Sequence, residues 1–223
     1  MFPALGSALV VLPCASARRP APGEGRSPYP RRMDEELRSL TERLRRESGG
    51  TAAYERLAGT ADHDELAGVL TESGQPLWAR ELAAFRLGLA GDRRAFEALV
   101  LLLNHRDPPR CAAAAHALAR LGDPRTARAA AALATNELRV AYALHPVRLL
   151  VELRAPESVP ALITTLQRRL TPHDPHRGVA LACVDGLGTL GDHRARPVLK
   201  EALAHPTLAE AAVRALERIP RQR

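Results

Sequence analysis

The chain has 223 residues, of which 46% are hydrophobic and only 3% are aromatic. With so few aromatic and β-branched runs, the core must be built from Leu, Ala and Val, which favours close-packed helices and argues against strands. The formal net charge is +7. The sequence excludes two classes of protein: those that span a membrane, and those held together by disulfides or by a CxxC metal site. No apolar run reaches the roughly 18–20 residues of a membrane span, and three scattered cysteines (Cys14, Cys111, Cys183) form neither a disulfide framework nor a CxxC metal site.

Residues 1–32 differ in composition from everything that follows. They hold five Arg and one acid, Glu24, so that they carry +4 of the total charge and leave only +3 for the other residues. The high pI is therefore weak support for nucleic-acid binding by the folded part. The apolar stretch 1–17 ends in Ala-Ser-Ala but lacks a positive n-region and is interrupted by Pro13. We expect a disordered or mis-assigned leader here rather than a signal peptide, and hence a cytoplasmic protein.

A helix is predicted to begin at Met33, where an acidic first turn precedes a stripe of leucines at helical spacing, Leu37, Leu40 and Leu44. Short helical patterns follow up to residue 75, with Asp62 as an N-cap. A helical stack needs terminal elements with a polar outer side. We therefore expect residues 33–75 to form an N-terminal cap.

Four similar segments then recur at the turn between two helices. Their equivalent positions are 92, 123, 155 and 192, so the steps are 31, 32 and 37 residues. Three of the four carry Gly followed by Asp. Gly in the left-handed conformation ends the first helix, and Asp is the N-cap of the second. Pro124 follows one Asp at the first helical position, where no donor is lost.

The third turn departs from this pattern, because Arg154-Ala155 replaces Gly-Asp. We expect this turn to be looser and less well capped. Prolines should also distort individual helices: Pro146 should kink the first helix of repeat three, and Pro160 and Pro197 should bend or delay two second helices. The segment 171–177 accounts for the longer step before repeat four.

These patterns predict an all-α fold, a right-handed α-α superhelix of about four helix pairs with terminal capping helices. Residues 76–219 would hold the repeats and a last unpaired helix, and 220–223 a tail. The sequence from Leu118 to Arg125, LARLGDPR, closely resembles HEAT-like repeats of the kind found in phycobilisome lyases. Residues 159–162 and 196–199 resemble the opening of that family's second helix. The resemblance covers about residues 76–219 and implies the fold, but hardly any function.

Local motifs for chemistry are weak. His173 and His176 flank a proline, which favours a solvated loop over a metal site. Trp78 and Glu81 could be placed in the cleft of a HEAT-like DNA glycosylase, but Trp78 is better explained as a cap on the core of the first repeat. We expect no catalytic residues, no cofactor and no metal, and therefore no enzyme.

Charge is more informative. The predicted second helices, 93–105, 124–135, 156–169 and 193–204, contain nine basic and three acidic residues, a surplus of six. In HEAT-like stacks the second helices line the concave face. An ordinary solvated face is one interpretation. The other is a ridge that binds an acidic protein segment or a phosphate backbone. The candidate partner-binding residues are Arg94, Arg125, Arg128, Arg168, Arg194 and Arg196.

The sequence thus favours a cytoplasmic scaffold or adaptor that binds an acidic segment of another protein on its concave face. A nucleic-acid-binding module, possibly of the DNA glycosylase kind, is the main alternative, and a lyase-type enzyme is a third. No membrane partner is expected, and the oligomeric state is left open.

Overall fold

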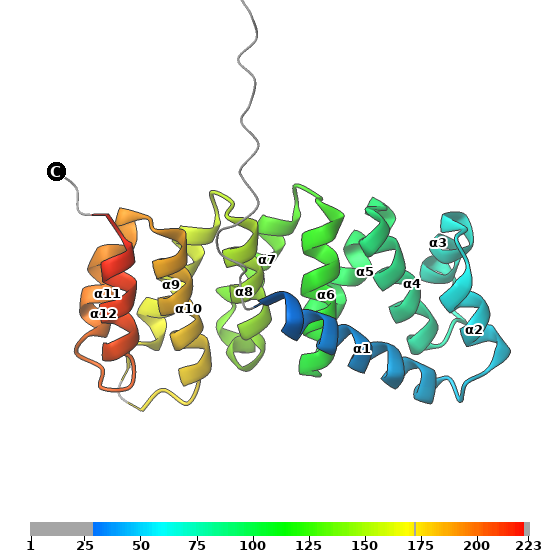
Figure 1. Cartoon of the computed structure of the whole chain (residues 1–223), viewed down its shortest axis with the longest axis horizontal. Helices are drawn as coiled ribbons and strands as arrows, with labels where there is room; N and C mark the ends of the chain where they lie inside the picture. Colours follow the sequence, from blue (N-terminus) through cyan, green and yellow to red (C-terminus); the bar gives the residue numbers. More distant parts are fainter. Residues whose placement is uncertain (1–28, 172, 221–223) are drawn as a thin grey trace, which may run out of the picture.

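The structure, a computed structural model, describes residues 29–171 and 173–220 of the chain, with side chains from residue 38 onward. Within these ranges the chain forms helices joined by turns, with no strand, arranged in one elongated row (Figure 1). The predicted all-α helical repeat solenoid is therefore confirmed. None of the helices in the described part is both long enough and apolar enough to cross a membrane.

Four helix pairs form the body of the row, as predicted. The first helices are α4 (Leu77–Ala90), α6 (Pro108–Leu121), α8 (Leu144–Leu153) and α10 (Arg177–Leu190). The second helices are α5 (Phe96–Leu103), α7 (Thr126–Ala134), α9 (Ser158–Arg169) and α11 (Arg196–Ala202), which together we call the second-helix layer. Short 3₁₀ turns η1 (Arg93–Ala95) and η3 (His193–Ala195) precede α5 and α11, and η2 (Glu137–Tyr142) follows α7.

Capping helices flank the four pairs. At the N-terminal end lie α1 (Tyr29–Glu47), α2 (Ala52–Gly59) and α3 (His63–Thr71), and at the C-terminal end α12 (Ala209–Arg218) packs on α10 and α11. The turns within the repeats lie along the upper edge of the row in Figure 1.

The turn geometry follows from the Gly-Asp pairs. Gly91, Gly122 and Gly191 have φ of 80°, 64° and 70°, the left-handed conformation that ends a helix. In the third turn Arg154 takes this place with φ 49°, and Ala155 offers no side-chain acceptor where the other turns have an aspartate that accepts from a backbone N–H. The expectation of a less well capped third turn is therefore confirmed. The Ser158 hydroxyl donates to the carbonyl oxygen of Leu150 near the C-terminal end of α8 at 2.6 Å, so it satisfies a carbonyl group of the preceding helix and does not replace the missing N-cap acceptor.

The core consists mainly of leucine and alanine, and the largest fully buried side chains are all leucines. Small residues let the helix axes come close. A Cβ on Gly188 of α10 would lie 2.8 Å from the Cα and Cβ of Ala215, so α10 and α12 meet nearly backbone to backbone.

The structure differs from the sequence predictions at the N-terminal end. α1 begins at Tyr29, so residues 29–32, assigned to the leader, are helical. Pro30 is compatible with this start because its missing N–H is not needed in the first turn. Residues 1–28 lie outside the described part. α1 also does not stay at the end of the row: it runs obliquely across α6 and α4 (Figure 1).

The kink predicted at Pro146 is absent. α8 begins at Leu144, and Pro146 lies in its first turn, where proline is tolerated. The break comes earlier, where η2 gives way to α8 at Ala143.

Candidate interaction surface

Three of the turns within the repeats share one polar arrangement, which we call the turn bracket. An aspartate Oδ1 accepts from the backbone N–H of the arginine two residues later, and the guanidinium of that arginine binds the same carboxylate. The backbone N–H···Oδ1 distances are 3.1, 2.9 and 2.8 Å, and the closest guanidinium contacts to Oδ2 are 2.6, 3.0 and 2.7 Å. The pairs are Asp92–Arg94, Asp123–Arg125 and Asp192–Arg194.

The turn brackets change the acidity of their carboxyls. Hydrogen bonds from Arg94 and Arg194 lower the pKa of Asp92 and Asp192 to about 2, and Arg125 likewise lowers the pKa of Asp123. These aspartates are therefore charged at neutral pH, and their charge cancels that of the bracket arginines.

Two of the bracket arginines also link successive elements. Arg94 Nη1 lies 2.7 Å from Asp64 of α3, and Arg125 Nη1 lies 3.2 Å from Glu97 of the preceding repeat. The Arg125 guanidinium also lies 3.9 Å above the ring of Phe96. In these two turns the bracket therefore joins neighbouring units as well as capping a helix.

The other predicted binding residues have separate environments. Arg168 lies 3.0 Å from Glu137 and donates to the carbonyl oxygen of Thr135 at 2.7 Å. Arg196 donates to carbonyl oxygens at the C-terminal end of α12, at 3.1 Å for Ile219. Arg128, on the exposed side of α7, makes no hydrogen bond or ion pair within the described ranges.

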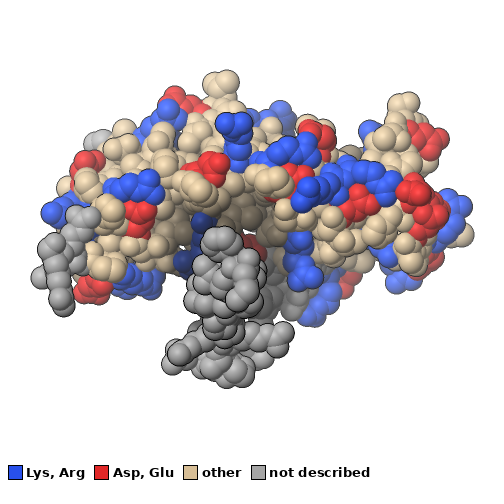
Figure 2. All heavy atoms as spheres, turned by 90° about the horizontal axis from the view of Figure 1, so that it is seen from above, with Lys and Arg blue, Asp and Glu red and all other residues tan. Residues whose placement is uncertain are grey.

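These contacts reduce the charge surplus counted from the sequence. The bracket aspartates Asp92, Asp123 and Asp192 each stand one residue before a predicted second helix, and including them lowers the surplus from six to three. Figure 2 looks down on the edge that carries the turns, and shows basic and acidic side chains next to one another rather than a continuous basic surface. The Asp-x-Arg spacing in the sequence was the signal that could have revealed this pairing.

Three exposed cations of the second-helix layer and its 3₁₀ turns remain without a hydrogen-bond or ion-pair partner in the part of the chain that the structure describes: Arg93, Arg128 and Lys200. Only Arg128 belongs to the set predicted from the sequence. A partner that approached this layer would meet these three cations, because the remaining positive charge is largely engaged.

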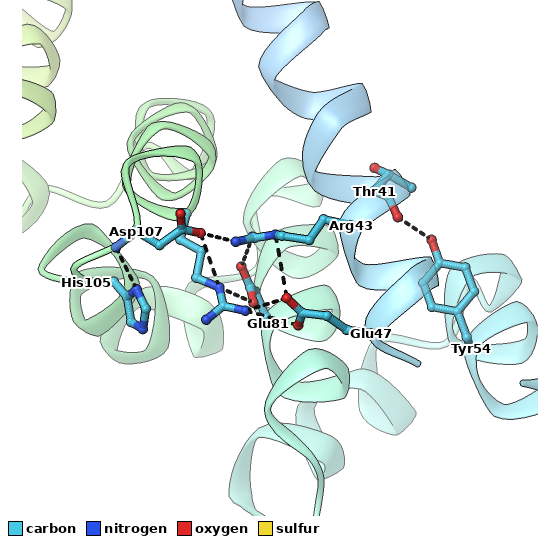
Figure 3. A network of polar contacts seen from close by, with 8 residues as sticks. Thr41, Arg43, Glu47, Tyr54, Glu81, His105 and Asp107 are labelled. Carbon is cyan, nitrogen blue, oxygen red and sulfur yellow. Dashed lines mark hydrogen bonds and ion pairs between the residues drawn. The ribbon is translucent and has the colours of Figure 1, made fainter. Parts of the chain in front are cut away.

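A second polar cluster, missed from the sequence, anchors α1 to the first helices. Glu81 of α4 is only 2% exposed and lies between Arg43 of α1 and Arg110 of α6, with ion-pair distances of 2.9 and 3.0 Å. Figure 3 shows Arg43 reaching Glu81, Glu47 and Asp107. We call these five residues the α1 anchor.

The electrostatics of the α1 anchor are those of a structural site. Burial raises the pKa of Glu81, and the two guanidinium groups oppose that shift. Beside the anchor, the backbone N–H of Asp107 donates to Nδ1 of His105 at 3.0 Å, so that this nitrogen is an acceptor. Every charged group of the α1 anchor lies within ion-pair distance of another group of the anchor.

Other candidates for chemistry are buried or isolated. Burial raises the pKa of Cys111 to about 11 and of Cys183 to about 12, which makes both thiols poor nucleophiles. Trp78 packs against the core, 6.1 Å from the ring of Tyr54, and Glu81 is occupied in the α1 anchor. Among the described residues, no group of three or more His, Cys, Asp or Glu is placed to hold a metal ion.

The histidine loop before α10 borders a cleft of about 460 Å³ between the α9–α10 and α11–α12 connections. His173 and His205 contribute to its lining, as do Arg169 and Arg177. Arg169 pairs with Asp174 at 3.2 Å, and Arg177 is exposed.

Comparison with known proteins agrees with the fold. Residues 179–205, which run from α10 through η3 to just beyond α11, match the family model described as PBS lyase HEAT-like repeat. This is the fourth repeat predicted from the sequence. No curated protein matches the chain.

Proposed function

The chain is a HEAT-like repeat protein, and from this premise we propose that it is a scaffold that binds an acidic segment of another protein on its second-helix layer. The observation that carries the proposal is a set of exposed cations that form no hydrogen bond or ion pair with any described residue. They are Arg93, Arg128 and Lys200, in the second-helix layer and its 3₁₀ turns. Charge-assisted hydrogen bonds to carboxylates are the interactions such groups form best.

The shape of the molecule supports a binding role. A row of helix pairs offers an extended surface along which a partner segment can lie. α1 packs mainly on the first helices α4 and α6. Solvent-exposed cations on this layer would raise the rate of encounter with an acidic partner and fix its position.

A direct test compares two triple variants with equal charge change. One is Arg93→Glu/Arg128→Glu/Lys200→Glu on the second-helix layer and its turn. The control is Arg80→Glu/Arg120→Glu/Arg177→Glu, at exposed positions of the first helices α4, α6 and α10. The probe is a fluorescein-labelled peptide of alternating Glu and Ser, followed by anisotropy at low and at physiological salt.

We expect the first variant to weaken peptide binding by about tenfold or more, and the control to bind within about threefold of the wild type. Equal losses in both variants would show a non-specific effect of net charge and contradict the proposal. Failure of the wild type to bind the peptide would also contradict it. If a labelled DNA duplex binds instead, with steep salt dependence, the nucleic-acid alternative is the correct one.

A further inference from the structure

We propose that the cleft bordered by the α9–α10 and α11–α12 connections is a second binding site, which takes a small organic molecule through a phosphate group. We call it the connection cleft. Two arginines, two histidines and two threonines meet in its lining. The site is separate from the second-helix layer of the proposed function, because both connections lie on the edge of the row opposite to the turn brackets (Figure 1).

The connection cleft has the size of a site for a small organic ligand. Its volume is about 460 Å³, and such sites occupy roughly 300–1,000 Å³. A water molecule takes up about 30 Å³ in the liquid, so the cleft is far larger than one inorganic ion needs. Its walls come from residues 169–180 and 204–208. A ligand would therefore contact two connections that are separate in the sequence.

One wall is held in place by an ion pair. The side chains of Arg169 and Asp174, 15% and 10% exposed, lie 3.2 Å apart. The other carboxylate oxygen of Asp174 accepts from the backbone N–H of His176 at 2.7 Å. A guanidinium has five N–H donors, and this ion pair engages the nitrogen Nη1. Arg169 is therefore fixed in position and keeps further donors for a ligand.

Arg177 supplies a charge that no neighbour compensates. It stands in the first turn of α10, which contains no acidic residue and has no side-chain N-cap. Its side chain is exposed and forms no hydrogen bond or ion pair with any described residue. Two arginines against one aspartate leave the lining with one positive charge when both histidines are neutral. The N-terminal end of the α10 dipole adds to this positive potential.

The opposite wall offers donors of other kinds. His205 and Thr207 stand on the α11–α12 connection, and their side chains form no hydrogen bond within the described ranges. The backbone there is held, because the carbonyl oxygen of His205 accepts from the N–H of Leu208 at 2.9 Å. An imidazole and a hydroxyl can each donate to an anion. His173 and Thr171 bring the same two kinds of group to the first wall.

This set of donors matches a phosphate monoester better than a carboxylate. The two oxygens of a carboxylate lie in one plane, whereas the donors of the connection cleft come from two walls. The three terminal oxygens of a phosphate monoester point in three directions and can accept from both walls at once. The small apolar side chains in the lining, Ala180, Ala204 and Pro206, leave room for the organic part of the ligand.

The test measures binding to the full chain by isothermal titration calorimetry. The probes are two esters with different organic parts, ribose 5-phosphate and phenyl phosphate. Ribose, inorganic phosphate and succinate are the comparison ligands. Arg177→Gln removes the unpaired guanidinium, and Arg120→Gln is its control at an exposed position of α6. Ala204→Trp fills the cleft without changing charge, and Ala132→Trp is its control at an exposed position of α7. Circular dichroism melting checks that each variant is folded.

We expect at least one ester to bind the wild type and both controls alike, and to bind Arg177→Gln and Ala204→Trp at least about tenfold more weakly. Ribose should not bind, and inorganic phosphate and succinate should bind at least about tenfold more weakly than that ester. If neither ester binds at about 10 mM, or if the control variants lose as much affinity, the connection cleft is not a phosphate site.

The comparison ligands test the assigned chemistry. If inorganic phosphate or succinate binds as tightly as the esters, the ligand class is wrong. A phosphoserine peptide that binds more tightly than both esters and is weakened by the same two substitutions would assign the connection cleft to a protein partner and overturn the inference. The proposed function is tested independently, because Ala204→Trp should bind the Glu-Ser peptide as the wild type does.

Discussion

At the scale of single residues, each turn bracket and the glycine before it combine three structural roles within four consecutive positions. Gly191 reverses the chain, Asp192 caps the following turn, and Arg194 neutralises the cap. A carboxylate that accepts from both a backbone N–H and a guanidinium is held more firmly than one that accepts from the backbone alone. The arginines that the sequence offers as binding groups therefore also contribute to the stability of the turns.

The bracket leads to a prediction about Asp192. Replacement by Ala should cost about 1 kcal/mol of unfolding free energy, as for other lost N-caps. Asp192→Asn keeps an acceptor oxygen and should cost less at pH 7. Both are measured by urea denaturation.

The same bracket predicts a pH dependence. Because the guanidinium of Arg194 lowers the pKa of Asp192 to about 2 in the folded chain, from 3.8 for an ordinary aspartate, the folded state binds fewer protons between these values. The stabilisation by this carboxylate is therefore complete above about pH 4 and is lost as the pH falls through about 2. The advantage of the wild type over Asp192→Asn should shrink across this window. An advantage that stayed constant between pH 4 and pH 2 would contradict the assigned role.

Part of this residue-level structure could be predicted from the sequence. Gly-Asp spacing was enough to predict the left-handed caps and the weaker third turn, because both follow from local backbone conformation. The charge count failed to anticipate the bracket, because it was confined to helical residues and left out Asp92, Asp123 and Asp192. The hydrogen bond from Arg139 to the carbonyl oxygen of Asn104 could not be predicted either, because it joins residues 35 positions apart.

At the scale of elements, α1 is the clearest departure from a simple stack. Its leucine stripe predicted a buried face, and Leu40 and Leu44 are indeed 1% and 0% exposed. The stripe does not specify which helices cover it, and α1 proves to lie across α6 and α4. The α1 anchor fixes this placement, because its charged groups come from three helices and match only when α1 is in register.

The α1 anchor predicts that Glu81→Ala destabilises the protein by about 3 kcal/mol. The reason is that Arg43 and Arg110, which are 19% and 11% exposed, would lose their central counter-charge. Amide protection in α1 should fall along with the urea midpoint. A suitable control is Glu210→Ala, which removes an exposed i,i+4 pair with Arg214 and should cost less than about 0.5 kcal/mol. A loss as small as that of the control would mean that leucine packing alone holds α1.

At the scale of the whole molecule, each helix pair contacts mainly its neighbours in sequence, so stability is distributed along the row rather than concentrated in one core. A change at one end should then stay local. This architecture could be predicted from the sequence, because the same helix–turn–helix pattern occurs in it four times. The sequence could not predict which surface charges have no ion-pair partner in the folded chain, since that depends on side-chain pairing between repeats.

Gly188 and Gly178 of α10 allow that locality to be tested. Gly188→Ala places a Cβ 2.8 Å from the backbone of Ala215 and should cost about 1–3 kcal/mol, more than the roughly 1 kcal/mol of helix propensity gained. Hydrogen exchange should accelerate in α10, α11 and α12, but not in α4 to α7. In Gly178→Ala the new Cβ meets nothing within 4 Å, so this variant should be neutral or slightly stabilised. Acceleration spread evenly over all helices would show that the row unfolds as a single unit.

Lys200 has a practical consequence of a different kind. It is the only lysine in the chain, and it lies exposed on α11. Amine-reactive dyes and cross-linkers can therefore attach at one internal position, on the side of the molecule where a partner is expected. A reporter placed there needs no engineered cysteine. Conversely, routine lysine cross-linking followed by mass spectrometry will be nearly blind to the rest of the surface, so mapping of contacts requires reagents directed at carboxyl or guanidinium groups.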